Sequence, residues 1–174
     1  MAPLFLLVIL ADSIPHYALI ALLVFVAACI TDFLDGNIAR KRNMVTDFGK
    51  FLDPLADKML TTAAFLAFMD MGLCNIWIIM IVLTREFLVT SVRLAASSSG
   101  KVVAASIWGK LKTVIQMVAI IAVLVMIEAG NCGILPESFP YSAVSNVLFW
   151  ISTFFTVVSG VQYVVDNRDF IKVK

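Results

Sequence analysis

The sequence predicts an all-α integral membrane protein, a six-transmembrane-helix bundle whose first helix is truncated. Of its 174 residues, 61% are hydrophobic and 14% are charged, whereas soluble domains carry about 25% charged residues. Five stretches are also long and apolar enough to cross a bilayer, which takes about 20 residues. This composition excludes an ordinary soluble globule and a disordered chain. The net charge of +1 excludes a basic nucleic-acid-binding protein, so we expect no nucleic-acid partner.

The expected helices follow one another along the chain with clear turns between them. Residues 1–11 are apolar but only about half as long as a membrane span, so we expect them to be the end of a helix whose beginning is missing from this sequence. Full-length helices are expected at 17–40, 47–69, 76–97, 107–128 and 141–165. Glycine, serine and proline residues mark the turns between several of them. The sequence contains no internal repeat and no segment whose amino-acid composition suggests a second domain. Residues 1–174 are therefore expected to form a single membrane domain.

The basic residues predict how the chain is oriented in the membrane. None of the 13 Lys and Arg residues falls in the segments 11–16, 70–75 or 129–140. Because loops rich in Lys and Arg stay in the cytoplasm, these three segments are expected to face outward, and the loop at 41–46 is expected to face the cytoplasm. His16, in the first outward segment, is expected to be a solvated loop residue and not a ligand.

Four aspartates mark the ends of two consecutive helices. Asp32 and Asp35 are three residues apart and share one helix face, and Asp53 and Asp57 are four apart on the next helix. A short loop makes these helices antiparallel neighbours, so the four carboxylates are expected to converge near the inner membrane surface. Like charges in such a site need counter-ions. Two divalent cations such as Mg²⁺ would satisfy them and could clamp the oxygens of a phosphoryl transfer.

The residues around these aspartates complete a recognisable pattern, Asp-x2-Asp-Gly-x2-Ala-Arg-x8-Gly-x3-Asp-x3-Asp, from Asp32 to Asp57. It resembles the signature of the CDP-alcohol phosphotransferase family. The resemblance implies a six-helix membrane enzyme, usually a homodimer, that cleaves the pyrophosphate of a CDP-linked lipid with two Mg²⁺ or Mn²⁺ ions and releases CMP. It implies metal binding by Asp32, Asp35, Asp53 and Asp57, with Asp57 also the catalytic base. It assigns the CDP-lipid to Asp32, Gly36, Ala39, Arg40 and Gly49.

A set of basic residues in the later helices bears on the acceptor alcohol. Arg85 lies near the middle of its expected helix, where charge is expensive, and the neighbouring Glu86 could partly compensate it. Arg93, Lys110 and Lys112 lie nearer the cytoplasmic end. We expect the four cations to bind the phosphate of a phosphorylated alcohol, although cations that simply snorkel to the interface would give the same pattern.

The segments around these cations resemble the family members that use sn-glycerol 3-phosphate as acceptor. The resemblance implies CDP-diacylglycerol as donor and a place in the bacterial inner (cytoplasmic) membrane, with the active site facing the cytoplasm. Inositol phosphate, phosphatidylglycerol or serine would be alternative acceptors for the same chemistry. A divalent-cation transporter, in which the aspartates select the ion, is an alternative from another class.

Overall fold

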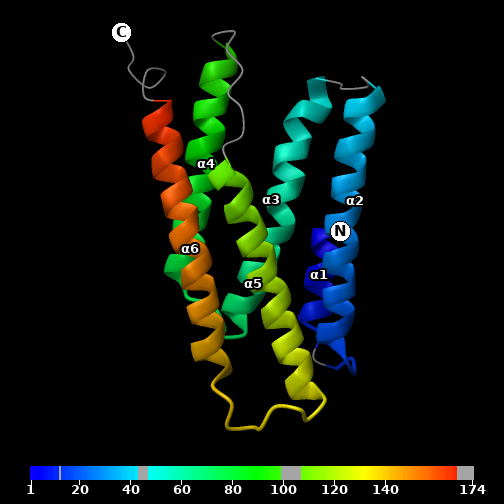
Figure 1. Cartoon of the computed structure of the whole chain (residues 1–174). Coiled ribbons are helices and arrows are strands. Elements are labelled where there is room, and N and C mark those ends of the chain that lie inside the picture. The colour runs from blue at the N-terminus through cyan, green and yellow to red at the C-terminus, as the bar shows by residue number, and fades with distance from the viewer. Residues whose placement is uncertain (12, 43–46, 99–106, 168–174) are drawn as a thin grey trace. The chain divides into compact units, whose positions relative to one another are not determined.

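The regular structure is α-helical in the part of the chain that is described. The structure, a computed structural model, describes residues 1–11, 13–42, 47–98 and 107–167, and its side chains except those at 33, 35–42, 47–57 and 94–98. Within these ranges the helices are α1 (Ala2–Ile9), α2 (Tyr17–Arg42), α3 (Asp47–Asp70), α4 (Ile76–Ser98), α5 (Ile107–Asn131) and α6 (Tyr141–Asp166) (Figure 1). Each of the five long helices begins at the residue predicted from the sequence and ends one to three residues later than predicted.

Local signals explain several of these boundaries. Asn75 accepts a hydrogen bond at its Oδ1 from the backbone N–H of Trp77 (2.9 Å), and so caps the start of α4. Gly72 and Gly133 follow the ends of α3 and α5 with φ values of 71° and 70°. This left-handed conformation is readily available to glycine and commonly terminates a helix.

The helices form two compact units, which are described separately. The first unit comprises Met1–Met71 and Ile120–Tyr141, and the second comprises Gly72–Ala119 and Ser142–Lys174. Helix α5 thus contributes its second half to the first unit and its first half to the second unit. Whether residues 1–174 act as a single domain stays a prediction.

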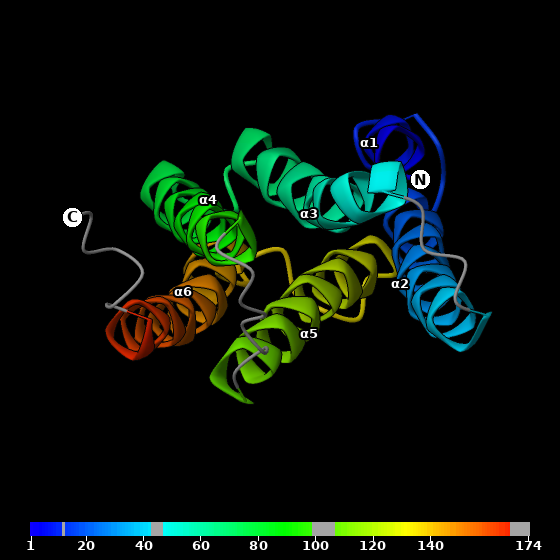
Figure 2. The same cartoon turned by 90° about the horizontal axis from the view of Figure 1, so that it is seen from above.

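In the first unit, the short helix α1 packs against both α2 and α3 (Figure 2). The ring of Phe5 meets Phe25 edge to face, with centroids 5.9 Å apart. Phe65 and Phe68 of α3 are also almost fully buried. With only 8 residues, α1 is much shorter than a membrane span. Phe5 and Ile9 therefore anchor one face of α1 in the core of this unit.

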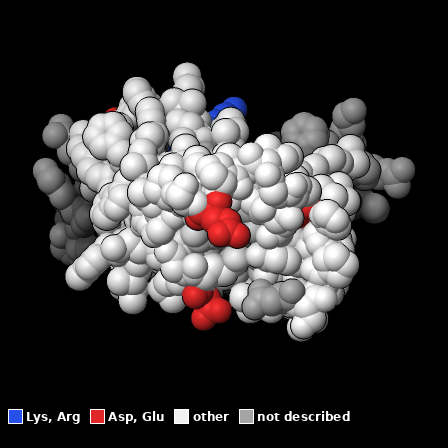
Figure 3. Space-filling model, turned by 90° about the horizontal axis from the view of Figure 1, so that it is seen from below, with Lys and Arg blue, Asp and Glu red and all other residues white. Residues whose placement is uncertain are grey.

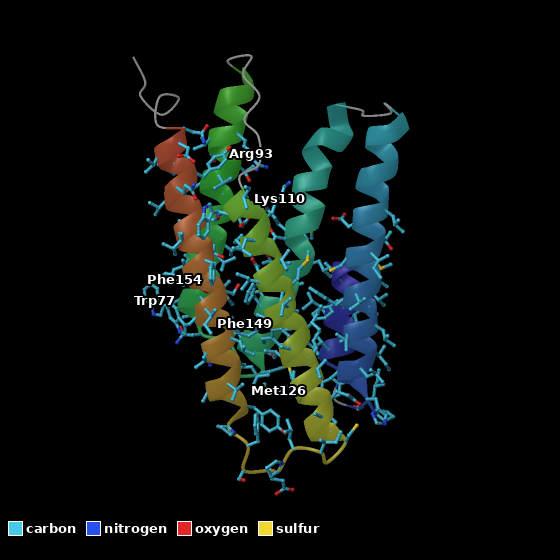
Figure 4. All side chains as sticks on the ribbon, viewed as in Figure 1. Trp77, Arg93, Lys110, Met126, Phe149 and Phe154 are labelled. Atoms are coloured by element: carbon cyan, nitrogen blue, oxygen red, sulfur yellow. The ribbon has the colours of Figure 1, made fainter. Side chains whose placement is uncertain are left out.

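In the second unit, α6 divides into a buried polar face and an exposed apolar face. The buried residues include Ser145, Thr153, Thr156 and Ser159. Thr153 Oγ1 donates to the carbonyl of Phe149 (2.8 Å), and Thr156 Oγ1 donates in the same way to the carbonyl four residues before it (2.9 Å). The opposite face exposes large apolar side chains, among them Val157, Val161 and Phe154, and Figure 4 shows Phe154 directed outward from α6.

The lengths of α2 to α6 are those of membrane-spanning helices. Each has 23 to 26 residues, and a bilayer needs about 20. Among the described residues, α5 and α6 are long and apolar enough to cross a membrane, and α2 has a shorter apolar stretch, Tyr17–Asp32. Seen from below, the described surface is largely uncharged, with a few carboxylates and a basic group near its edge (Figure 3). The helical class is confirmed, whereas six membrane crossings stay a prediction.

Candidate active site

The aspartate motif lies on α2 and α3, on both sides of the connection at 43–46. Asp32 and Asp35 belong to α2, and Asp53 and Asp57 belong to α3. Continuous helix through each pair means that the two aspartates of a pair are about one turn apart. The helical placement that the sequence predicted is therefore confirmed for both pairs.

Asp32 is the one member of this motif whose side chain is described, and it is exposed. The hydroxyl of its neighbour Thr31 donates to the carbonyl of Ala27 (2.8 Å) and so is used within α2. The side chains of the other predicted site residues on these helices lie outside the described part of the chain: Asp35, Gly36, Ala39, Arg40, Gly49, Asp53 and Asp57. The convergence of the four carboxylates therefore stays a prediction.

The second unit contains a polar network centred on Glu86 of α4. Its Oε1 accepts hydrogen bonds from Arg85 Nη1 (3.1 Å) and from Lys112 Nζ of α5. Arg85 Nη2 donates to Ser159 Oγ of α6 (2.5 Å). The side chains of Arg85, Glu86 and Lys112 are only 12%, 13% and 6% exposed. The sequence-based expectation that Glu86 compensates Arg85 is confirmed, and Lys112 joins the same carboxylate.

Gly160 of α6 makes room for this network. A Cβ at position 160 would lie 2.8 Å from Arg85 Cγ, which is closer than two non-bonded carbon atoms approach in proteins. Glycine therefore lets the stem of Arg85 pass against the backbone of α6 and reach Ser159. The sequence alone gives no reason for a glycine here, because the crowding arises between helices that are far apart along the chain.

Arg93 and Lys110 differ from the other two predicted cations because their side chains are exposed. The Arg93 guanidinium lies over the ring of Tyr163, 5.7 Å from its centroid, a cation–π arrangement that orients the charged group. Arg93 on α4 and Lys110 at the start of α5 are found toward the same end of this unit (Figure 4). Of the four predicted cations, Arg93 and Lys110 are therefore exposed, whereas Arg85 and Lys112 are mostly buried and bonded to Glu86.

One polar cluster was missed by the sequence analysis. His16 is an exposed loop residue, as expected, and in addition its Nδ1 lies 2.5 Å from Oε1 of Glu128. Glu128 Oε2 also accepts a hydrogen bond from the backbone N–H of Leu19 (3.2 Å). The sequence could not reveal this partner because it is 112 positions away, and only the packing of the first unit brings the two side chains together.

Comparison with known proteins shows the family of the chain. A family model described as CDP-alcohol phosphatidyltransferase matches residues 1–158. The chain is 42% identical over 161 residues to the CDP-diacylglycerol–glycerol-3-phosphate 3-phosphatidyltransferase of Bacillus subtilis, covering 92% of this chain and 80% of that protein. It is 36% identical over 149 residues to the protein of the same name from Rickettsia bellii, covering 86% of this chain and 79% of the relative.

A third relative is named a probable phosphatidylglycerophosphate synthase, from Mycobacterium tuberculosis. It is 39% identical over 166 residues, which cover 94% of this chain and 74% of that protein. The family match includes both helices that carry the aspartates and both helices that carry the basic residues. The chain therefore belongs to the CDP-alcohol phosphatidyltransferase family.

Proposed function

We propose that this protein transfers the phosphatidyl group of CDP-diacylglycerol to sn-glycerol 3-phosphate, giving phosphatidylglycerophosphate and CMP. The observation that carries the proposal is the complete aspartate motif, placed at the end of α2 and the beginning of α3. The names of the relatives from Bacillus subtilis and Rickettsia bellii support the choice of donor and acceptor. The exposed cations of the second unit fit an acceptor that carries a phosphate.

The donor set of the motif fits two divalent cations, Mg²⁺ or Mn²⁺. Asp32, Asp35, Asp53 and Asp57 offer only carboxylate oxygens, the ligands that these hard ions prefer. When bound, the ions would neutralise negative charge on the pyrophosphate and on the departing CMP. Gly36, Ala39 and Gly49 have little or no side chain, which favours close approach of the nucleotide to the helix backbones. Arg40 would contribute charge to the diphosphate.

The reaction itself needs a base at the acceptor hydroxyl. We assign this role to Asp57, which would accept the proton of the primary hydroxyl as its oxygen attacks the lipid-side phosphorus. The bond from that phosphorus to the CMP oxygen breaks in the same displacement, and the electron pair leaves with CMP. No covalent intermediate with the protein is required.

Recognition of the acceptor is assigned to the four basic residues. Arg93 and Lys110 are the candidates for direct contact with the acceptor phosphate, because their side chains are exposed. The stacking on Tyr163 would hold the Arg93 guanidinium ready for a bidentate contact. Arg85 and Lys112 add positive charge, but Glu86 already neutralises part of it.

The membrane setting follows from the length and charge of the helices. We propose that the chain lies in the bacterial cytoplasmic membrane, that the long helices α2 to α6 cross it, and that the active site faces the cytoplasm. The lack of Lys and Arg in the segments 11–16, 70–75 and 129–140 supports this orientation. We also propose that it forms a homodimer, which light scattering on the purified protein would test.

The test is CMP release from CDP-diacylglycerol by the purified protein with Mg²⁺ or Mn²⁺. Glycerol 3-phosphate, inositol phosphate, serine and phosphatidylglycerol are compared as acceptors. Asp57→Asn is expected to lower turnover about 10²- to 10⁴-fold, the usual contribution of a general base, while lipid binding is largely retained. Asp70→Asn, an exposed carboxylate at the other end of α3, is the matched control and should leave activity unchanged.

Three outcomes separate the parts of the proposal. Release that depends on glycerol 3-phosphate supports both the chemistry and the acceptor. Release that depends on another acceptor keeps the role of the aspartates but overturns the assignment of Arg93 and Lys110. Full activity in Asp57→Asn overturns the assignment of the base.

A further inference from the structure

A second group of metal-ligating side chains lies in the first unit, away from the aspartate motif in the sequence. His16 precedes α2, Glu128 lies in the last turn of α5, and Cys132 follows that helix. Their ligand atoms all lie within 4.8 Å of one another. The proposed reaction uses none of these three residues.

The spacing of the three atoms is close to that of a tetrahedral metal site. Around Zn²⁺, ligand atoms are separated by about 3.3 Å for nitrogen and oxygen, and by about 3.5–3.8 Å when sulfur is involved. Cys132 Sγ lies 3.5 Å from Glu128 Oε1. His16 Nδ1 lies 2.5 Å from the same oxygen, as a hydrogen bond. An ion would therefore require the imidazole to move away from Glu128 by less than about 1 Å.

Backbone hydrogen bonds hold all three residues in place. The carbonyl of His16 accepts from the N–H of Ile20 (3.1 Å) in the first turn of α2, and the N–H of Cys132 donates to the carbonyl of Glu128 (2.9 Å). Leu19 N–H binds Glu128 Oε2 (3.2 Å), which leaves Oε1 directed to the other two side chains. Such second-shell contacts orient the ligands of metal sites before the ion arrives.

The cluster is also open to water. The His16 side chain is 57% exposed, and Cys132 is exposed as well. Imidazole nitrogen, thiolate sulfur and carboxylate oxygen together are ligands typical of Zn²⁺. Mg²⁺, which prefers oxygen ligands only, is disfavoured there. The mixed ligands of this cluster therefore favour a different ion from the carboxylate oxygens of the aspartate motif.

We propose that His16, Glu128 and Cys132 form a binding site for Zn²⁺ or a similar borderline transition-metal ion. The ion takes Nδ1, Oε1 and Sγ as protein ligands and keeps a fourth position for water. On binding, the thiol proton of Cys132 is released to solvent, and the His16 proton moves from Nδ1 to Nε2 through exchange with water. No oxidation or reduction takes place.

The experiment is a Co²⁺ and Zn²⁺ titration of the purified full-length chain in detergent, with excess Mg²⁺ present to occupy oxygen-only sites. Co²⁺ bound to a thiolate gives a sulfur-to-metal charge-transfer band in the near ultraviolet. The wild-type protein is expected to show this band, to bind one Co²⁺ per chain at this site, and to lose the band when Zn²⁺ displaces Co²⁺. Cys132→Ser should abolish the band, and His16→Gln should weaken Zn²⁺ binding about tenfold or more.

Cys74→Ser and Cys29→Ser are the matched controls, because they remove a thiol elsewhere in the chain. Both should keep the band and the affinity of the wild type. Gel filtration and circular dichroism show whether each variant is folded, and the wild-type spectrum tests the site without any variant. Absence of the band in the wild type overturns the proposal, as does Zn²⁺ affinity that is unchanged in both Cys132→Ser and His16→Gln.

Discussion

Lys112 and Arg85 donate hydrogen bonds to the same carboxylate oxygen, Oε1 of Glu86. One cation comes from α5 and the other from α4, and Arg85 also reaches Ser159 of α6. Because all three charged side chains are mostly buried, the carboxylate offsets part of the cost of placing two cations in a medium of low polarity. The network therefore ties together the three helices of the second unit.

Glu86→Gln is expected to destabilise the protein by about 3–5 kcal/mol, because it removes the carboxylate that faces both Arg85 and Lys112 in this buried network. A thermal unfolding scan of the purified protein in detergent would show a lower Tm. Glu137→Gln, an exposed carboxylate outside the helices, is the control and should leave Tm unchanged. Equal Tm values for Glu86→Gln and the wild type would show that the network adds no stability.

Gly160→Ala is expected to destabilise the protein by about 1–3 kcal/mol, the range for overpacking in a filled core. The added Cβ would lie 2.8 Å from Arg85 Cγ, so the arginine stem must move. A double-mutant cycle with Arg85→Ala checks this cause. The Gly160→Ala penalty should become much smaller when the Arg85 side chain is absent, and an unchanged penalty would point to the backbone of α6 instead.

Arg93→Ala and Lys110→Ala are expected to raise KM for glycerol 3-phosphate about 10- to 100-fold, the effect of losing a charged hydrogen bond. The value of kcat should change much less, because neither residue is assigned to the proton transfer. Steady-state kinetics with varied acceptor measure both constants. Lys58→Ala offers a comparison with another cation, and an equal rise of KM in that variant would argue against a specific acceptor site.

Cys132 is expected to react with a maleimide that cannot cross membranes, and Cys74 is expected to stay unlabelled. Burial raises the pKa of Cys74 to about 12, so at pH 8 only about one thiol in 10⁴ is the reactive thiolate. Desolvation and the neighbouring Glu128 carboxylate raise the pKa of Cys132 as well, so its labelling should speed up as pH rises from 7 to 9.

The labelling is measured on intact cells by mass spectrometry, with a chelator present so that no bound metal protects the thiol. Cys132→Ser removes the expected label and serves as the control. If Cys132 is labelled only after the membrane is broken, the proposed outward orientation of the segment 129–140 is wrong.

Helix positions could be predicted closely because the signals are local. Asn75, Gly72 and Gly133 lie where the sequence analysis placed turns, and the structure shows a cap or a left-handed residue at each. The helical spacing of the aspartates also follows from sequence alone, because it depends only on the period of the helix. These features need no knowledge of which helices are neighbours.

The partners of individual polar groups could not be predicted in the same way. His16 and Glu128 are 112 positions apart, and Lys112 and Glu86 are 26 apart. Each pairing depends on which faces of two helices meet, and an apolar sequence places little constraint on that choice. A sequence can show that a buried cation needs a counter-charge, but packing decides which residue supplies it.

The hydroxyl groups of Thr153 and Thr156 bear on how the protein is made. Both find their hydrogen-bond acceptors in the backbone of α6 itself, so these two buried hydroxyls are satisfied within the helix. In the membrane setting proposed above, neither hydroxyl would then need a neighbouring helix to satisfy it when α6 enters the lipid. Contact with the rest of the unit depends instead on shape, because the missing side chain at Gly160 leaves the space that the stem of Arg85 occupies against α6.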